Sequence, residues 1–248
     1  MLLDDVKFAA YLDEAGDDLA SASSILRSSN INYAILRDTW ISDINGFNDN
    51  KCKTARTILD DNDISVISIA CNKISDINRV SDIANYFKSY YIRIIKPNNI
   101  TNIDKWLHEL DIVGKERDLQ LLLEPNITFG SKLDDLLLCS KYSNVRVLFD
   151  PVELLLKHNH NFIDGLFDPL INYISAVDIR DYKHGFGFKN IGFGSAQIKS
   201  IVSKLGRDFN GWYFMEPNLG RRYGSIIGRS EIFKSAVESF KSVLQEIK

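Results

Sequence analysis

The chain has 248 residues, of which 45% are hydrophobic and 25% charged, and this is the composition of an ordinary globular protein rather than a disordered or fibrous one. Its net charge of −3 argues against a dedicated nucleic-acid surface, and its three cysteines form no C-x-x-C pair, which argues against a zinc finger or a disulfide framework. No apolar run approaches the ~18 residues of a membrane helix and the N-terminus lacks the features of a signal peptide, so we expect a cytoplasmic protein that does not engage a membrane.

Eight short apolar runs, rich in Val, Ile, Leu and Tyr, follow one another along the chain. In order they are Val6–Tyr11, Tyr33–Leu36, Ser65–Ala70, Tyr91–Ile95, Leu119–Leu123, Val145–Phe149, Ala176–Ile179 and Trp212–Met215. Several of them are continuous rather than alternating, which is expected for strands that are buried on both faces of a parallel sheet. We therefore predict eight strands.

Helical patterns lie between several of these runs, because apolar residues recur there at the three-to-four-residue spacing of one helix face. The recurring positions are Ile77, Val80, Ile83, Ala84 and Phe87; Leu133, Leu136 and Leu137; Ile198, Ile201, Val202 and Leu205; and Ile232, Ala236, Phe240, Val243 and Leu244. A strand and the helix after it together take roughly 30 residues, the size of one βα unit.

Eight such units predict a closed (β/α)₈ TIM barrel, and the chain length is close to the ~250 residues typical of that fold. We expect one domain over residues 1–248. An open, doubly wound sheet is the alternative, but that fold more often has a glycine-rich phosphate turn after its first strand. Here the first strand runs into the acidic segment Leu12–Asp18, which favours the barrel.

Carboxylates stand at the ends of the last four predicted strands, which is where TIM barrels carry their active sites. Glu124 follows the fifth strand, Asp150 the sixth and Glu216 the eighth, and Asp178 lies in the seventh. Four carboxylates at one barrel mouth repel one another and resist ionisation, and a hard divalent cation relieves that repulsion by binding their oxygens. The alternative is that each acid caps a helix or pairs with a neighbouring base.

The order and spacing of these motifs resemble the xylose-isomerase-like TIM barrels, the sugar phosphate isomerase/epimerase superfamily. Segment 177–183, V-D-I-R-D-Y-K, is similar to the family's V-H-I-K-D stretch, and segment 214–219, F-M-E-P-N-L, is similar to its L-E-P-H-L ending. The resemblance covers nearly the whole chain. It implies that Glu124, Asp150, Asp178 and Glu216 are metal ligands, with Asp178 in the place of the family's histidine.

Three departures from the family pattern bear on the expected site. Asp178 in place of His makes the four ligands all oxygen, which favours Mn²⁺ or Mg²⁺ over Zn²⁺, unless this shorter side chain leaves the site unable to hold a metal. Residues 192–194 read G-F-G where the family often has G-E-G, and Glu153 stands where some epimerases have a second histidine.

The reaction that the resemblance implies is the isomerisation or epimerisation of a small sugar, a sugar acid or an inositol derivative. A proton moves between adjacent carbons through an enediolate, whose charge the metal stabilises. Glu124 and Glu216 are the predicted acid/base pair, and Asp150 is a ligand and orienter. If only one glutamate works, isomerisation or dehydration is favoured over epimerisation.

Other polar residues near the predicted strand ends are candidates for substrate contacts. They are Arg37, Arg93, Lys96, Glu153, Lys183 and His184. For the cations the alternatives are structural ion pairs or a solvated surface, and Arg180 is assigned to that surface at least as readily as to a ligand role. The glycine-rich segment 184–194 is predicted to be either a lid that excludes water or a flexible connection. Trp40, Arg221 and Arg222 are further candidates, with packing or solvation as their alternatives.

Two other functions stay open from the sequence. A barrel that has lost catalysis and binds a ligand or a partner protein is consistent with Asp178 and with the acid missing from residues 192–194. An AP-endonuclease-like metal hydrolase is disfavoured, because four scattered histidines and a net acidic chain suit neither a trinuclear zinc site nor a DNA groove. Such barrels often associate, so the sequence is also compatible with a homo-oligomer.

Overall fold

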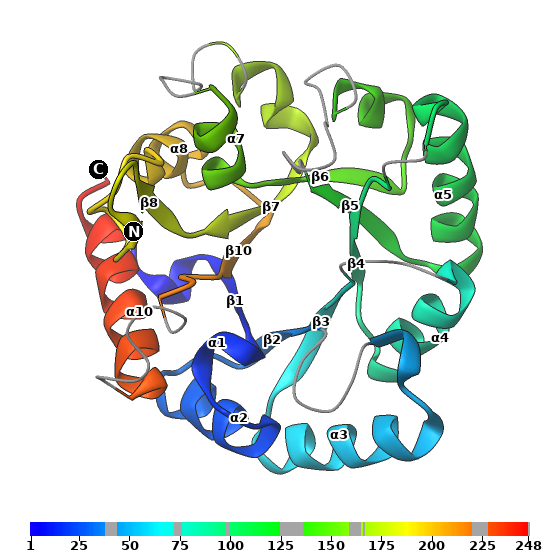
Figure 1. Ribbon diagram of the computed structural model, residues 1–248, viewed down its shortest axis with the longest axis horizontal. Coiled ribbons are helices and arrows are strands. Elements are labelled where there is room, and N and C mark those ends of the chain that lie inside the picture. Colours follow the sequence, from blue (N-terminus) through cyan, green and yellow to red (C-terminus); the bar gives the residue numbers. More distant parts are fainter. Residues whose placement is uncertain are drawn as a thin grey trace.

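The computed structural model describes the chain apart from residues 38–43, 72–75, 98–99, 125–135, 159–164, 166, 220–227 and 248. Parallel strands close into a barrel in the order β1-β10-β7-β6-β5-β4-β3-β2 (Figure 1). The barrel strands are β1 (Lys7–Tyr11), β2 (Tyr33–Arg37), β3 (Ser65–Ala70), β4 (Tyr91–Ile95), β5 (Gln120–Glu124), β6 (Val145–Phe149), β7 (Ile174–Ile179) and β10 (Trp212–Met215). The predicted (β/α)₈ barrel is confirmed, and the open doubly wound sheet is not formed.

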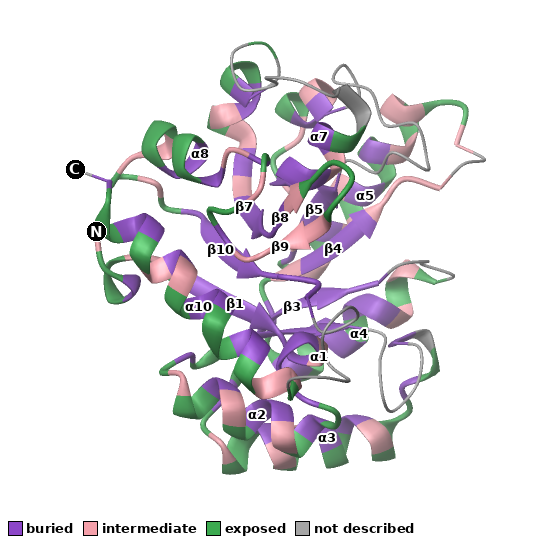
Figure 2. Cartoon of the chain, turned by 60° about the vertical axis from the view of Figure 1, so that its left-hand side comes forward, coloured by how far each residue is buried: buried purple, intermediate pink, exposed green. Residues whose placement is uncertain are grey.

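Helices surround the barrel wall, as Figures 1 and 2 show. They are α1 (Leu12–Ala15), α2 (Leu19–Ser28), α3 (Asp49–Asp61), α4 (Ile77–Phe87), α5 (Ile103–Arg117), α7 (Pro151–His158), α8 (Ile198–Leu205) and α10 (Arg229–Gln245), with 3₁₀ helices η1 (Leu3–Asp5), η2 (Ile44–Gly46), η3 (Leu138–Lys141) and η5 (Asp168–Tyr173). None of the helices in the described ranges is long and apolar enough to cross a membrane.

Short polar side chains set where several helices begin. The Asp76 carboxylate accepts the backbone N–H groups of Asn78 and Arg79 at 2.9 and 3.3 Å, and this fixes the first turn of α4. Asn48 and Asn102 cap α3 and α5 in the same way, through the N–H groups of the third helical residues. Such caps satisfy donors that the helix itself leaves without partners.

The interior of the barrel is filled by one apolar cluster, because alternate side chains of each strand point inward. Its members are Ala9, Tyr11, Ile35, Ile67, Ala70, Leu122, Leu148, Ala176, Trp212 and Phe214. The rings of Tyr11 and Phe214 meet edge to face with their centroids 6.3 Å apart. This cluster forms an apolar floor below the carboxyl ends of the strands, so polar groups at those ends are shielded from solvent on that side.

A small antiparallel hairpin follows β7 and was not predicted as strands. It consists of β8 (Asp181–Lys183) and β9 (Gly187–Lys189). The buried Asp181 carboxylate ties its base, accepting the N–H groups of Tyr182, Gly192, Gly194 and Ala196 at 2.8–3.0 Å. The segment that was predicted as a lid or a flexible connection is therefore anchored through one carboxylate.

Candidate metal centre

The four predicted acids lie at one end of the barrel, on strands that are neighbours in the order β10-β7-β6-β5. Glu124 ends β5, Asp150 follows β6, Asp178 lies in β7 and Glu216 follows β10. Their exposed fractions are 1%, 0%, 0% and 4%. Buried carboxylates are costly unless other charges or hydrogen bonds compensate them, so this end of the barrel must contain strong compensating partners.

Three of the four acids form a compact group. Glu124, Asp150 and Asp178 each offer a carboxylate oxygen, and these oxygens all lie within 4.8 Å of one another. Glu216 does not join that group, although its charge is close enough to raise the pKa of Asp178. The structure therefore brings together three of the predicted ligands and places the fourth beside them.

Three buried arginines compensate the acids. Arg93 donates from Nε to Glu124, and Arg37 donates from Nη1 to Glu216. Arg180 holds Asp150 through two nitrogens, with Nε 3.0 Å from Oδ1 and Nη2 on Oδ2. From the sequence, a solvated surface position was at least as favoured for Arg180 as a ligand role, and the surface position is wrong. Arg180, which follows β7, is buried against Asp150, which follows the neighbouring strand β6.

Asp178 is held by a tyrosine hydroxyl, whereas each of the other three acids is held by an arginine. The Tyr11 hydroxyl donates to its Oδ1 at 3.3 Å, and its buried Oδ2 has no hydrogen-bond partner among the described residues. Burial, reinforced by the charges of Glu216 and Glu124, raises its pKa well above the ordinary value. An aspartic acid in this setting holds its proton unless a cation compensates the carboxylate.

Glu216 also has an oxygen without a partner, but its ionisation is different. Its Oε2 is buried and accepts no hydrogen bond from the described residues. Burial opposes ionisation of this group, yet Arg37, Arg180 and Arg93 outweigh it and lower its pKa from 4.5 to about 2. Glu216 is therefore a carboxylate at neutral pH, next to Asp178, whose pKa burial raises.

The donor set fits a hard divalent cation. It consists of carboxylate oxygens, which suit Mg²⁺, Mn²⁺ or Ca²⁺ better than Zn²⁺. Among the described residues, two of the five buried side-chain oxygens without a hydrogen-bond partner, Asp178 Oδ2 and Glu216 Oε2, belong to predicted ligands. Because a buried polar atom without a partner normally signals a missing ligand, ion or water, this observation supports a cation at the acid group.

Glu14 is a site residue that the sequence analysis did not single out. It lies in α1, directly after β1, and is 8% exposed. Its Oε2 accepts the backbone N–H of Asn218 at 2.9 Å, and Arg37 Nη2 lies 3.3 Å from its Oε1. Burial raises its pKa from 4.5 to about 7 despite Arg37. The acidic segment after the first strand was the only signal for it in the sequence.

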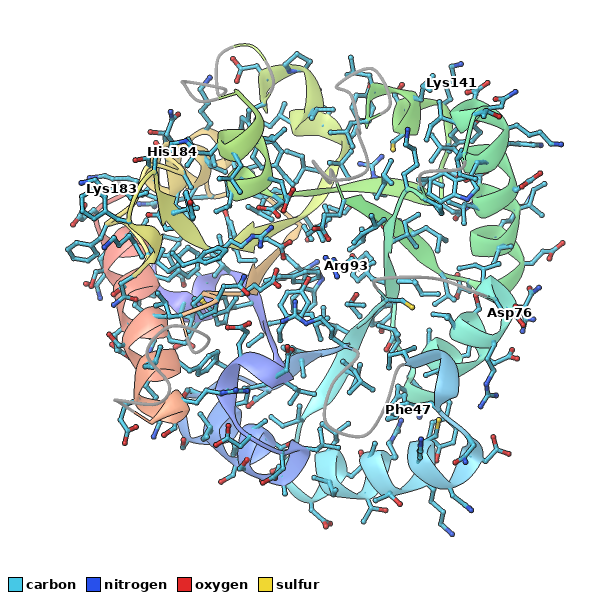
Figure 3. All side chains as sticks on the ribbon, viewed as in Figure 1. Phe47, Asp76, Arg93, Lys141, Lys183 and His184 are labelled. Carbon is cyan, nitrogen blue, oxygen red and sulfur yellow. The ribbon has the colours of Figure 1, made fainter. Side chains whose placement is uncertain are left out.

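The predicted substrate contacts separate into two groups. Arg37 and Arg93 are buried among the acids, Glu153 lies beside Arg180, and Lys96 is half-buried just after β4. Lys183 and His184 are exposed on the hairpin, and Figure 3 shows them at the rim of the barrel, far from the central Arg93.

Both hairpin side chains engage aromatic rings instead of the acids. The Lys183 ammonium lies 5.4 Å from the Phe186 ring centroid, and the ring of His184 lies 5.8 Å from that of Tyr182. Trp40, Arg221 and Arg222 lie outside the described residues.

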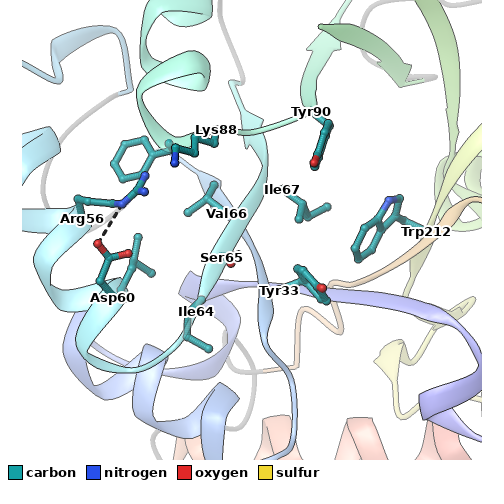
Figure 4. A pocket seen from close by; sticks show the side chains of 12 residues that line it. Tyr33, Arg56, Asp60, Ile64, Ser65, Val66, Ile67, Lys88, Tyr90 and Trp212 are labelled. Carbon is teal, nitrogen blue, oxygen red and sulfur yellow. Dashed lines mark hydrogen bonds and ion pairs between the residues drawn. The ribbon is translucent and has the colours of Figure 1, made fainter. Parts of the chain in front are cut away.

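Cavities also exist at the opposite end of the barrel. One of about 340 Å³ is lined by the first residues of β2, β3 and β10, among them Tyr33, Ser65 and Trp212 (Figure 4). Arg56 and Asp60 on its wall are paired with each other at 3.0 Å. Trp212 belongs to the apolar floor, so this cavity is separated from the acids by the packed interior of the barrel.

Comparison with known proteins shows which solved structures share this fold. No protein-family model matches the sequence, and no curated protein matches it. Among solved structures, a xylose isomerase domain containing protein from Salmonella typhimurium has a TM-score of 0.75 at 16% identity, over 99% of this chain and 100% of that one.

Two further structures have the same fold. A xylose isomerase-like TIM barrel protein from Mycobacterium smegmatis, solved with magnesium, has a TM-score of 0.70 at 16% identity, over 96% of this chain and 98% of that one. A D-psicose 3-epimerase from Clostridium cellulolyticum, solved with D-tagatose, has a TM-score of 0.64 at 11% identity, over 97% of each chain. The chain therefore has the xylose isomerase-like TIM barrel fold.

Proposed function

We propose that this xylose isomerase-like TIM barrel is a divalent-metal-dependent isomerase or epimerase of a small sugar, sugar acid or inositol derivative. The observation that carries the proposal is the buried group of Glu124, Asp150 and Asp178, with carboxylate oxygens within 4.8 Å of one another. Support also comes from the magnesium and D-tagatose that two proteins of the same fold carry.

In this proposal Glu124, Asp150, Asp178 and Glu216 hold Mn²⁺ or Mg²⁺, and the bound ion supplies Lewis acidity at the sugar oxygens. Glu216 is ionised at neutral pH, which is the form that a base needs in order to accept a proton from carbon. Glu124 is the acid of the pair: in its protonated form it gives a proton to the neighbouring carbon in isomerisation or to the opposite face in epimerisation, and it becomes the carboxylate as Glu216 becomes the acid. Asp150 orients the group, since two backbone N–H groups and Arg180 fix its carboxylate.

The surroundings favour proton transfer within the site over exchange with bulk water. The apolar floor closes the barrel below the acids, and the acids themselves are almost fully buried. In such a setting an electrostatic contact is stronger than it is in water. Arg37 and Arg93 lie among the acids with donors that suit the hydroxyl and carbonyl oxygens of a polyol.

The test is solvent hydrogen exchange at carbon. The protein is incubated with Mn²⁺ in deuterated buffer with ketoses, aldoses, sugar acids and inositol derivatives, and the products are read by proton NMR. We expect one carbon-bound hydrogen to exchange and an isomer or epimer to form, while loss of water would assign a dehydratase. Glu124→Gln and Glu216→Gln should each slow exchange at least about 100-fold, and Glu109→Gln, on the exposed face of α5, serves as the control.

A catalytically inactive ligand-binding barrel is the second candidate, because Arg93, Arg180 and Arg37 already compensate three of the four acids. Calorimetric binding of a sugar without any exchange at carbon, with Mn²⁺ present, would select this candidate. The absence of both exchange and sugar binding would contradict both functions.

A further inference from the structure

Asp150 is the predicted ligand whose oxygens are most fully engaged. Its Oδ1 accepts the N–H groups of Val152 and Glu153 at 2.9 and 3.2 Å, and Arg180 Nε at 3.0 Å. Its Oδ2 accepts Arg180 Nη2. A carboxylate has about four lone-pair sites for donors or metals, and here four donors share them. Three of these donors crowd Oδ1, and the one on Oδ2 brings the positive charge of Arg180 next to any cation there, so a cation at Asp150 competes with Arg180.

Arg180 is the donor that is able to leave. The two N–H groups belong to the first turn of α7, and losing them would unwind the start of that helix. Arg180 is a side chain, and its Nη2 already lies 3.4 Å from Glu153 Oε1. Glu153 is 18% exposed at its side chain, whereas Asp150 is fully buried. A second acceptor thus stands next to the guanidinium and outside the compact group of acids.

We propose that Arg180 competes with the divalent cation for Asp150, and that Glu153 receives Arg180 when the cation binds. The inference rests on the proposed function, because it assumes that Asp150 is a metal ligand. It assigns Arg180 and Glu153 as positioning residues that set the affinity of the site for metal. Glu153 then acts through Arg180 rather than by touching substrate.

Arg37 shows the same arrangement on the other side of the acids. It donates to Glu216 and also holds Asp13, with Nε 3.0 Å and Nη2 2.6 Å from Asp13 Oδ2. Glu14 Oε1 lies 3.3 Å from the same Nη2. When Glu216 turns to a cation, Arg37 keeps a bidentate partner in Asp13, so its guanidinium is not left buried without a carboxylate. Both arginines therefore have an acceptor outside the ligand set.

The test is calorimetric titration of the full-length protein with Mn²⁺, in the absence of substrate. Arg180→Gln should bind Mn²⁺ about tenfold more tightly than wild type, and Glu153→Gln about tenfold more weakly. The double variant should bind as tightly as Arg180→Gln, because Glu153 acts only through Arg180. Arg180→Lys keeps the charge but loses the fork geometry that fits Asp150, so it too should bind more tightly than wild type.

General electrostatics predicts a different pattern. The loss of one positive and one negative charge would cancel, and the double variant would then bind as wild type does. Arg117→Gln is the matched control, since it removes the same charge from an exposed pair with Asp82 at 2.7 Å, and its affinity should not change.

Each outcome decides a separate question. Wild-type affinity in Arg180→Gln and Arg180→Lys, or in the double variant, overturns the competition but leaves the metal site in place. Tight binding that appears only after Arg180 is replaced supports the competition strongly. If neither wild type nor any folded variant binds Mn²⁺, the proposed metal-dependent function is wrong and this inference falls with it.

Discussion

Glu14 allows a direct measurement of how the charged end of the barrel affects stability. Replacing it with Gln removes a titratable group but keeps an acceptor for the Asn218 N–H, which donates to Glu14 Oε2 over 2.9 Å. Arg37 retains Asp13 and Glu216 as partners. The substitution therefore changes the protonation of the site with little change in its packing.

The expected effect follows from the pKa of Glu14. Burial raises that pKa from 4.5 to about 7, so between these pH values the folded chain binds more protons than the unfolded chain. The free energy of unfolding therefore falls as the pH rises through this window. At ~1.4 kcal/mol for each pH unit, the interval from 4.5 to about 7 corresponds to a loss of about 3 kcal/mol.

Urea denaturation across this pH window, with a chelator present, measures the effect. Glu14→Gln should match wild type near the acidic end and exceed its free energy of unfolding by about 3 kcal/mol above pH 7. Glu109→Gln, an exposed glutamate on α5, should follow the wild-type profile. Parallel profiles for wild type and Glu14→Gln would refute the reasoning, because they would mean that Glu14 is not held protonated in the folded protein.

Three other perturbations test separate parts of the structure. A Cβ at Gly194 would lie 2.1 Å from Asp181 Oδ1, so Gly194→Ala should lower the free energy of unfolding by about 2 kcal/mol. Gly165→Ala is the control, because a Cβ at Gly165 would have no atom within 4 Å and should leave this free energy unchanged. Leu148→Ala opens a cavity in the apolar floor and should cost about 3 kcal/mol in urea denaturation. Mn²⁺ at about 100 times its dissociation constant should raise the free energy of unfolding by about 2.7 kcal/mol, and the melting temperature should rise with it and fall again when EDTA is added. A melting temperature that does not change with Mn²⁺ would contradict a metal site in the folded state.

The barrel could be predicted from the sequence because buried parallel strands leave a simple signal. β3, β4, β6 and β10 have the predicted bounds, since most residues of each are apolar. The β8–β9 hairpin left no such signal, because its strands are three residues long and each contains one apolar residue, in the sequences D-Y-K and G-F-K. Its base is fixed by Asp181, which collects N–H donors from up to fifteen residues away, and periodicity does not record contacts of that kind.

The acids could also be predicted, because the ends of barrel strands are the known place for chemistry. The residues that pair with these acids could not be predicted, since each pair joins side chains from strands that are far apart in the sequence and meet only in the closed barrel. Arg37 meets Glu216 over a separation of 179 residues, and Glu14 is buried only because β1 and β10 close the barrel side by side. Arg180 and Lys183 were treated alike because both flank Asp178 in the sequence, although Arg180 lies buried between β7 and β8 and Lys183 is exposed at the end of β8.

The measurement that most directly tests the metal centre is anomalous diffraction from crystals grown with Mn²⁺, recorded at the manganese absorption edge. We expect one anomalous peak per chain, within bonding distance of oxygens from Glu124, Asp150 and Asp178, with Glu216 turned toward it. Arg180 should then contact Glu153 rather than Asp150. A map with no peak among these carboxylates at saturating Mn²⁺, or with its only peak elsewhere on the chain, would show that these acids do not form a metal centre.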